Sequence, residues 1–381
     1  MKPLKILTIF GTRPEAIKMA PVIRELRRSA KVISHVCVTA QHREMLDQVL
    51  DLFNIIPDYD LDLMHPRQTP TQVAARVLLE LDPLLNDLRP DWILVQGDTT
   101  TVMAAAMAAR YLKIKVGHVE AGLRTGDFLN PFPEEMNRIV TDAISDLHFA
   151  PTASARDNLL REGISEESIL ITGNTIIDVL LEVANQPWAP EPTHPLYPWS
   201  HCNGQPGQPK LILVTAHRRE SFGRPLQNIC YALKEIARQG RNELQIFYPV
   251  HRNPNVYQPV HQLLANTPNI TLLPPLDYLS LVQLMKRSAL ILTDSGGIQE
   301  EAPSLGVPVL VLRQVTERPE GVEAGAARVI GTNPERVVAE TLGLLADPEA
   351  YQTMARTINP YGDGHAAKRI VSRLLKDVGC D

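Results

Sequence analysis

The stretch LILTDSGGIQEEAPSLGVPVLVLR, residues 290–313, decides the fold of this chain. It opens with an apolar strand that ends near Asp294. A glycine turn and a helix expected from about Ile298 to Leu305 come next, followed by a second apolar strand at 307–312. Two continuous apolar strands joined by a helix are typical of a parallel βαβ unit. The stretch therefore predicts an α/β fold with a buried parallel sheet.

The glycine turn also predicts a binding site. Ser295, Gly296 and Gly297 expose backbone N–H groups at the start of a helix, where anions are favoured. Glu301 lies about one turn further on, where a carboxylate can accept hydrogen bonds from two vicinal hydroxyls, as in a ribose. A structural glycine turn is the alternative, but together the four residues favour a nucleotide site.

The same alternation of strand and helix runs through the whole chain. Amphipathic helices are predicted at 15–28, 71–88, 101–111 and 226–238. Two sets of buried parallel strands indicate two doubly wound, Rossmann-like domains. The strands are predicted at 4–10, 32–39, 92–96, 115–120, 147–150 and 169–172, and at 210–215, 244–250, 270–273, 289–293, 307–312 and 328–330.

Proline marks the expected domain boundary. Seven of the chain's 31 prolines lie in residues 186–209, and such a run forms neither a helix nor an inner strand. We therefore predict an N-terminal domain at 1–185, a linker at 186–209 and a C-terminal domain at 210–359. Ligands of doubly wound domains bind beyond the carboxyl ends of the strands, so we expect both domains to face one cleft.

Composition excludes several classes of function. With 381 residues and a net charge of −5, the chain has no basic field for nucleic acid or anionic lipid. No apolar run reaches 18 residues, so no membrane span is predicted. The first apolar stretch resembles a strand more than a signal peptide. The four cysteines are far apart, which favours a reducing, cytoplasmic compartment over a zinc or disulfide framework.

Charged side chains follow the predicted strands of the first half. Arg13 and Lys18 stand beside the start of the first helix, where they suit a phosphate. Asp98 follows the strand 92–96, Glu120 ends the next strand, and Glu134 begins a later helix. Considered alone, Asp98 is equally consistent with a helix cap, and Glu134 is equally consistent with an interaction with the helix dipole.

Together, these three carboxylates predict proton chemistry. Asp98, Glu120 and Glu134 come from segments that the fold would bring to one rim, and three carboxylates in one cleft repel. The repulsion favours a division into an acid and a base, as a two-proton reaction requires. His118 and Glu120 lack the helical HExxH spacing, so we expect no metal, and the first turn lacks GxGxxG, so we expect no nicotinamide cofactor.

The second half supplies cations at the corresponding edge. His217, Arg218 and Arg219 follow the strand 210–215, and His251 follows the strand 244–250. Arg318 lies in the segment TERPEGVEAG, which should reach the same edge. A cluster of imidazole and guanidinium groups suits a diphosphate.

These motifs, in this order, resemble the non-hydrolysing UDP-N-acetylglucosamine 2-epimerases of bacterial surface-polysaccharide synthesis. The resemblance runs from about Leu4 to about Leu374, and the proline-rich stretch differs from the family pattern. It is carried by FGTRPEAIKMAP, TAQHREMLDQVL, GDTTT, GHVEAGLRTG, TGNTIID, HRRESFG, TDSGGIQEEAPSLG, TERPEGVEAG and NPYGDG.

The resemblance implies a glycosyltransferase B-type fold in which the last helix, within 360–381, crosses back onto the first domain. It implies interconversion of UDP-N-acetylglucosamine and UDP-N-acetylmannosamine by a homodimer without cofactor or metal. Asp98, Glu120, Glu134 and His217 would perform the catalysis, and Asp98 and Glu120 would also contact the substrate. UDP would be held by Arg13, Lys18, His217, Leu276, Leu281, Ser295, Gly296, Gly297, Glu301 and Arg318.

Regulation by a second substrate molecule is also implied. Its site would comprise Gln41, Arg67, Glu134, Arg219 and His251. Two alternatives remain open at this point: a retaining UDP-sugar glycosyltransferase, which would need an acceptor pocket, and a non-catalytic sensor of UDP-sugars.

Overall fold

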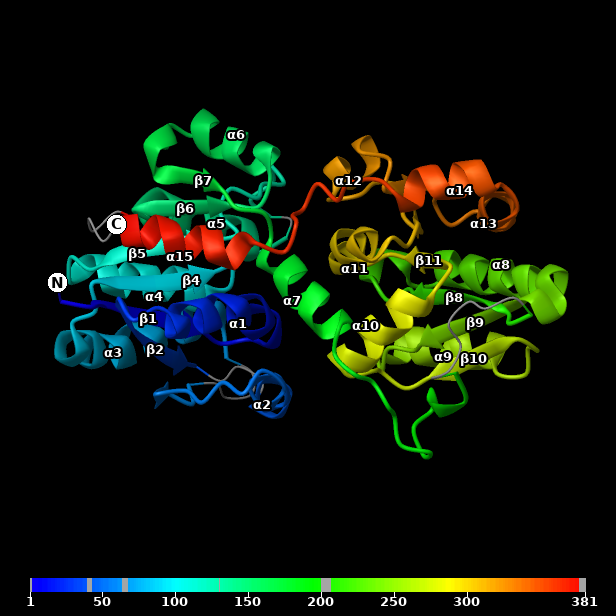
Figure 1. The fold of residues 1–381 in the computed structure, drawn as a ribbon, viewed down its shortest axis with the longest axis horizontal. Helices are drawn as coiled ribbons and strands as arrows, with labels where there is room; N and C mark the ends of the chain where they lie inside the picture. The colour runs from blue at the N-terminus through cyan, green and yellow to red at the C-terminus, as the bar shows by residue number, and fades with distance from the viewer. Residues whose placement is uncertain (1, 40–42, 64–67, 130, 200–206, 377–381) are drawn as a thin grey trace. The chain divides into compact units, whose positions relative to one another are not determined.

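The computed structural model describes residues 2–39, 43–63, 68–129, 131–199 and 207–376. Within this part of the chain the fold divides into two compact units. The first comprises Met1–Val179 together with Tyr361–Asp381, and the second comprises Leu180–Pro360. Each unit is built around its own parallel sheet (Figure 1).

The sheet of the first unit has seven strands among the described residues, in the order β3-β2-β1-β4-β5-β6-β7. All of its pairings are parallel, and the strand order reverses between β1 and β4, which is where doubly wound sheets bind ligands. The strands are β1 (Leu4–Phe10), β2 (Val32–Val38), β3 (Tyr59–Asp60), β4 (Trp92–Gln96), β5 (Lys115–Val119), β6 (Leu147–Ala150) and β7 (Ile169–Ile171).

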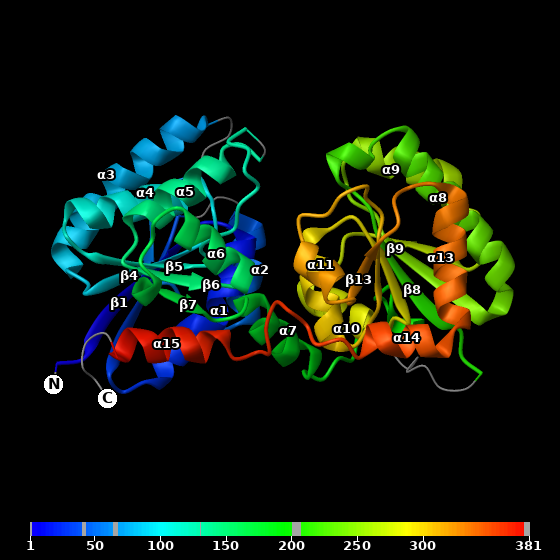
Figure 2. The same ribbon diagram turned by 90° about the horizontal axis from the view of Figure 1, so that it is seen from above.

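Helices cover both faces of this sheet. The helices α3, α4 and α5 lie on one face, and α1 and α15 pack together on the other (Figure 2). The alanine-rich α4 allows close packing against α3 and α5, because Ala104, Ala105 and Ala106 are fully buried. The helices are α1 (Arg13–Arg28), α2 (Arg43–Leu52), α3 (Pro70–Leu88), α4 (Thr100–Tyr111), α5 (Glu134–Ile144), α6 (Ala153–Arg161), α7 (Thr175–Ala184) and α15 (Ala366–Lys376).

The second unit repeats this design. Its sheet, six-stranded within the described chain, has the parallel order β10-β9-β8-β11-β12-β13 and reverses between β8 and β11. Figure 2 shows α8, α9 and α13 on one face and α10 and α11 on the other. The strands are β8 (Lys210–Thr215), β9 (Leu244–Pro249), β10 (Ile270–Leu273), β11 (Leu290–Thr293), β12 (Val309–Val311) and β13 (Ala327–Val329). The helices are α8 (Arg224–Gly240), α9 (Pro254–Leu264), α10 (Tyr278–Arg287), α11 (Gly296–Glu301), α12 (Pro319–Glu323), α13 (Pro334–Ala346) and α14 (Pro348–Ala355).

Most predicted strands and helices are present within one to two residues of the expected bounds, and the α/β class is confirmed. The short edge strand β3 was not predicted. The helix expected to begin at Ile298 begins at Gly296 instead, so both glycines lie in its first turn, and it continues as a 3-10 helix at Ala302–Leu305.

The proline-rich stretch differs most from expectation. The boundary between the units falls inside α7, after Val179, and residues 186–199 and 207–209 belong to the second unit. Apolar side chains hold the described part of the stretch there. Leu196 is fully buried, and the Trp199 ring meets the Phe247 ring edge-on at 5.2 Å. The guanidinium of Arg287 lies 4.9 Å above the Trp188 ring.

Candidate active site

A buried glutamate joins the loops that follow β1 and β4. Glu15 accepts hydrogen bonds from the backbone N–H groups of Gly11 and Thr12 at 2.7 and 2.8 Å, and from the Thr99 hydroxyl at 2.6 Å. Burial raises the pKa of this carboxyl, although these hydrogen bonds act to lower it. A side chain on Gly11 would collide with Thr39 Oγ1 at 2.3 Å, so the tight turn requires glycine.

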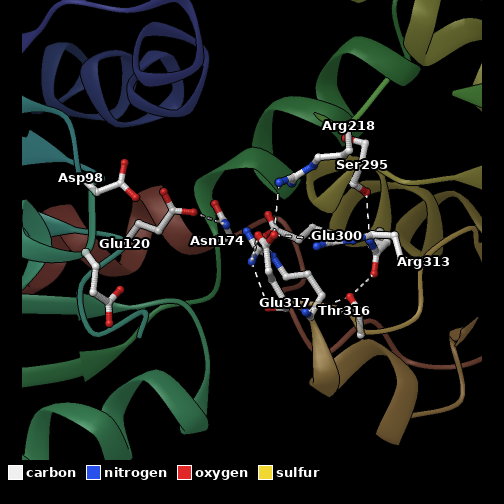
Figure 3. Close-up of polar contacts among 12 residues, drawn as sticks. Asp98, Glu120, Asn174, Arg218, Ser295, Glu300, Arg313, Thr316 and Glu317 are labelled. Atoms are coloured by element: carbon white, nitrogen blue, oxygen red, sulfur yellow. Dashed lines mark hydrogen bonds and ion pairs between the residues drawn. The ribbon is translucent and has the colours of Figure 1, made fainter. Parts of the chain in front are cut away.

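Glu120 stands directly after β5 and is surrounded by donors. Lys18 Nζ lies 2.6 and 2.7 Å from its two carboxylate oxygens, and Asn174 Nδ2 donates to Oε1 at 3.0 Å (Figure 3). The Gln96 amide donates to the other oxygen. The backbone of Glu120 has φ 66°, a left-handed conformation that costs a glutamate energy. Such strain at a charged residue is typical of a functional position.

Asp98 follows β4 and is paired with Arg138 of α5. Arg138 also contacts Glu135 at 3.1 Å, and the Asn137 side chain donates to the Asp98 carbonyl at 2.9 Å. The helix cap of α4 is Thr99, whose hydroxyl accepts from the Val102 N–H. The interpretation of Asp98 as a cap is therefore wrong, and its carboxylate is paired with the Arg138 guanidinium instead.

Glu134 is the first residue of α5, as predicted, and is half-buried. It lines a cavity of about 220 Å³ together with Thr99, Thr100 and Asn137. Asp98 and Glu120 follow neighbouring strands, and α5 reaches the loop of Asp98 through Asn137. The predicted carboxylates of the first unit thus stand along one edge of its sheet.

A network centred on the fully buried His118 and Asp142 lies next to this edge. His118 Nδ1 lies 2.6 Å from Asp142 Oδ1, and His118 Nε2 lies 2.8 Å from the Gly97 carbonyl oxygen. Asp142 also accepts from the Gly122 N–H and from Arg124. Burial would raise the pKa of Asp142, but the charges of His118 and Arg124 outweigh it and lower the pKa. Both ring nitrogens of His118 are thus engaged by protein groups of this network.

In the second unit, Asp294 organises the loop that follows β8. Its Oδ2 accepts from the backbone N–H groups of His217 and Arg218, both at 2.8 Å, and from the Ser221 hydroxyl at 3.0 Å. The His217 ring stacks on the His251 ring with centroids 5.4 Å apart. Both histidines therefore stand at the carboxyl edge of the sheet, as predicted.

Three arginines gather near the start of α11. Arg218 and Arg313 contact the Glu317 carboxylate at 3.2 and 3.1 Å, and Arg318 is paired with Glu300 (Figure 3). Burial would raise the pKa of Glu317, but these cations outweigh it and lower the pKa. A methyl group on Gly296 would lie 3.4 Å from Arg218, so the first turn of α11 is close to this cationic cluster.

The remaining predicted nucleotide contacts lie beside α11. The buried Tyr278 hydroxyl donates to Glu301 Oε2 at 2.9 Å. Leu276 precedes α10 and Leu281 lies in its first turns, so both belong to the segment that carries Tyr278. The backbone of Ser295 forms the N-cap of α11. This arrangement offers apolar, hydroxyl-binding and anion-binding groups on one unit.

Some site predictions remain without structural description. Gln41 and Arg67 lie outside the described residues. Arg13 is half-buried at the start of α1, and Arg219 begins a 3-10 turn, Arg219–Ser221.

Within the described ranges, no group of three or more His, Cys, Asp and Glu side chains is placed to hold a metal ion. In the same ranges no helix has both the length and the apolar character needed to cross a membrane.

Sequence reasoning missed several residues that complete the site. Gln96 and Asn174 are neutral amides, which carry no recognisable signal in a single sequence, although Asn174 stands in the quoted motif TGNTIID. Arg138, one turn after Glu134 in α5, was not predicted as a site residue. Asp294 was assigned only as the end of a strand.

Comparison with known proteins agrees with the family resemblance of the sequence motifs. A family model described as UDP-N-acetylglucosamine 2-epimerase matches residues 24–375. The UDP-N-acetylglucosamine 2-epimerase of Salmonella typhimurium is 54% identical, over 97% of this chain and 98% of that protein. The crystal structure of UDP-GlcNAc 2-epimerase from Neisseria meningitidis bound to UDP-GlcNAc has a TM-score of 0.87 and 47% identity, covering 98% of this chain and 100% of that one.

A more distant likeness concerns the fold alone. MurG from Acinetobacter baumannii has a TM-score of 0.62 at 16% identity, over 98% of this chain and 99% of that chain. Two Rossmann-like units of this kind make up the glycosyltransferase B-type fold expected from the sequence.

Proposed function

The chain belongs to the UDP-N-acetylglucosamine 2-epimerase family, and from this premise we propose that it interconverts UDP-N-acetylglucosamine and UDP-N-acetylmannosamine by inversion at C2. It is an epimerase and hence an isomerase. The observation that carries the proposal is the set of carboxylates after β4, after β5 and at the start of α5. Among them, Glu120 is bound to Lys18 and two amides.

The chemistry requires that UDP leave during the reaction. The hydrogen at C2 is not adjacent to a carbonyl, so its direct removal is prohibitive. Cleavage of the bond between C1 and the phosphate oxygen gives C1 cationic character, which acidifies C2–H. A base takes the proton, the bond electrons form the C1–C2 double bond, and UDP departs to leave 2-acetamidoglucal. Protonation of C2 on the other face and return of UDP to C1 give the epimer.

We assign the proton transfers to the first unit. Asp98, Glu120 and Glu134 supply the proton acceptor and donor, which general acid–base catalysis requires near the reacting carbon. Lys18 and Arg138 keep two of these carboxylates oriented. Exclusion of water would protect the glycal intermediate from capture.

We assign the grip on UDP mainly to the second unit. The N–H groups of Ser295, Gly296 and Gly297 favour the pyrophosphate, and cationic groups stabilise the charge that develops on it as it leaves. Glu301 accepts from the ribose hydroxyls, and apolar side chains pack against the uracil. The proposed UDP ligands are Arg13, Lys18, His217, Leu276, Leu281, Ser295, Gly296, Gly297, Glu301 and Arg318.

Three further features belong to the proposal. A second substrate molecule would activate the enzyme at a site that includes Glu134, Arg219 and His251, together with Gln41 and Arg67. The protein would act as a homodimer. Its place would be the cytoplasm, which the widely separated cysteines favour.

Incubation with UDP-N-acetylglucosamine alone in D₂O tests this function. We expect deuterium at C2 of both UDP-N-acetylglucosamine and UDP-N-acetylmannosamine, with no net release of UDP. A retaining glycosyltransferase would leave C2 unlabelled and would require an acceptor. A sensor would bind the nucleotide and exchange nothing. Absence of C2 deuterium under conditions where UDP binds would overturn the assignment.

A further inference from the structure

One carboxylate oxygen of Asp294, Oδ1, takes no part in the hydrogen bonds that hold the loop after β8. The residue is fully buried, and its Oδ2 already accepts three hydrogen bonds from the loop that follows β8. Among the residues that the structure describes, Oδ1 has no hydrogen-bond partner. Buried carboxylate oxygens are rarely left without a donor, because they lose their hydration on folding.

The group that faces this oxygen is the imidazole of His217. His217 Nδ1 lies 3.9 Å from Asp294 Oδ1, just beyond hydrogen-bond distance, and the ring is 39% exposed. A small rotation of the imidazole would bring Nδ1 within reach of Oδ1. The backbone of His217 cannot drift during this rotation, because its N–H is bound to the other oxygen of the same carboxylate.

We propose that Asp294 is a positioning residue for His217. It accepts the Nδ1–H of the ring, directs Nε2 outward to the diphosphate, and stabilises the protonated imidazole while UDP departs. This inference rests on the proposed function, and it assigns to Asp294 a role in addition to anchoring the loop. The pair acts as a carboxylate–imidazole dyad on the unit that binds UDP.

The charges around His217 determine the sign of the effect. Burial lowers the pKa of His217, and Asp294 opposes this by favouring the charged ring. His251, stacked on the ring, and Arg218, the next residue, act in the same direction as burial. Since Asp294 is the group that favours the imidazolium, its neutralisation should lower the pKa of His217 further.

Nuclear magnetic resonance of the ring nitrogens tests the pair in the intact protein without substrate. His217 signals are assigned from the variant His217→Gln. In the wild type we expect the neutral ring to carry its proton on Nδ1, an observation that needs no other variant. In Asp294→Asn we expect the pKa of His217 to fall below its wild-type value. In the control Ser221→Ala, which removes one donor to Oδ2 but keeps the charge, we expect no fall.

Kinetics separate positioning from simple loop stability. Asp294→Asn should shift the alkaline limb of the kcat/KM profile to lower pH, and its loss of activity should vanish in the His217→Gln background. A proton on Nε2 in the wild type, an unchanged titration in Asp294→Asn, or an equal loss in both backgrounds would overturn the proposal. If the wild type does not epimerise the substrate, the proposed function fails, while the titration still decides the dyad.

Discussion

Lys18 Nζ contacts both carboxylate oxygens of Glu120, at 2.6 and 2.7 Å, across 102 positions of the chain. The contact joins the first helix to the residue after β5 and brings a cation to the carboxylate with the strained backbone. Neither residue indicates this ion pair from its own position in the sequence. Parallel strand order places β1 beside β4 and β4 beside β5, and the ion pair follows from that order.

Glu120→Gln should reduce kcat by about 100-fold or more, the usual scale for losing an acid or base. The amide cannot accept a proton, and its NH₂ group would face Lys18 and Asn174, which are themselves donors. Turnover is measured by chromatographic separation of the two UDP-sugars. Glu80→Gln, on an exposed position of α3, serves as the matched control and should retain full activity. A loss smaller than tenfold at Glu120 would contradict this role.

Asp98→Asn and Glu134→Gln should each reduce kcat by about 100-fold or more for the same reason. Binding of UDP, measured by calorimetry, should change little, because the proposed UDP ligands do not depend on these two groups. The exposed Asp87→Asn is the control for charge removal. Near-wild-type rates for the variants at Asp98, Glu120 and Glu134 would remove the assignment of proton chemistry to this edge.

Arg318→Gln should weaken UDP binding about tenfold or more. Charge-assisted hydrogen bonds contribute about 1.5–3 kcal/mol each, so one lost guanidinium corresponds to that change in Kd. Arg356→Gln, at an exposed position of the same unit, should leave Kd unaltered. Equal affinities for the Arg318 variant and the control would place the diphosphate elsewhere.

Asp142→Asn should destabilise the first unit by about 3 kcal/mol or more, because it removes the fully buried carboxylate that pairs with Arg124 and is hydrogen-bonded to His118 and the Gly122 N–H. The folded pKa of Asp142 is lowered, so its contribution to stability is present above the unfolded pKa of about 3.9. As pH falls through the folded pKa, that contribution is lost. The difference in unfolding free energy between wild type and variant should therefore be largest near neutral pH and should disappear in strong acid.

Tryptophan fluorescence measures this difference in the stability of the first unit. Trp92 is buried in the first unit, whereas Trp188 and Trp199 belong to the second. With the latter two replaced by Phe, the urea transition reports on the first unit alone. Identical midpoints for wild type and variant at pH 7 would contradict the predicted cost.

Most of the fold was predictable from sequence because the strands are continuous runs of buried residues. Trp92–Gln96 and Lys210–Thr215 were predicted to the residue. The edge strand Tyr59–Asp60 has two residues and no apolar run, so no periodicity announces it. The unit boundary was placed too late because α7 is an ordinary amphipathic helix, whereas the prolines that follow it look like a linker.

The positions of the candidate residues in the fold were predictable where a charged or titratable side chain follows a strand. Asp98, Glu120 and His217 follow β4, β5 and β8, as expected. The donors around Glu120 were not predictable, because Gln96 is the last residue of a strand and Asn174 precedes a helix, and both are uncharged. Their function depends on the close approach of β4, β5 and the loop before α7, which no single segment encodes.

Cleavage and re-formation of the bond between C1 and the phosphate oxygen is the central claim, and positional isotope exchange measures it directly. UDP-N-acetylglucosamine carrying ¹⁸O in the bridge between C1 and the β-phosphorus is incubated with the enzyme in D₂O. We predict that the label spreads into the non-bridging β-phosphate positions while C2 acquires deuterium. Deuterium at C2 with the ¹⁸O fully retained in the bridge would contradict the account.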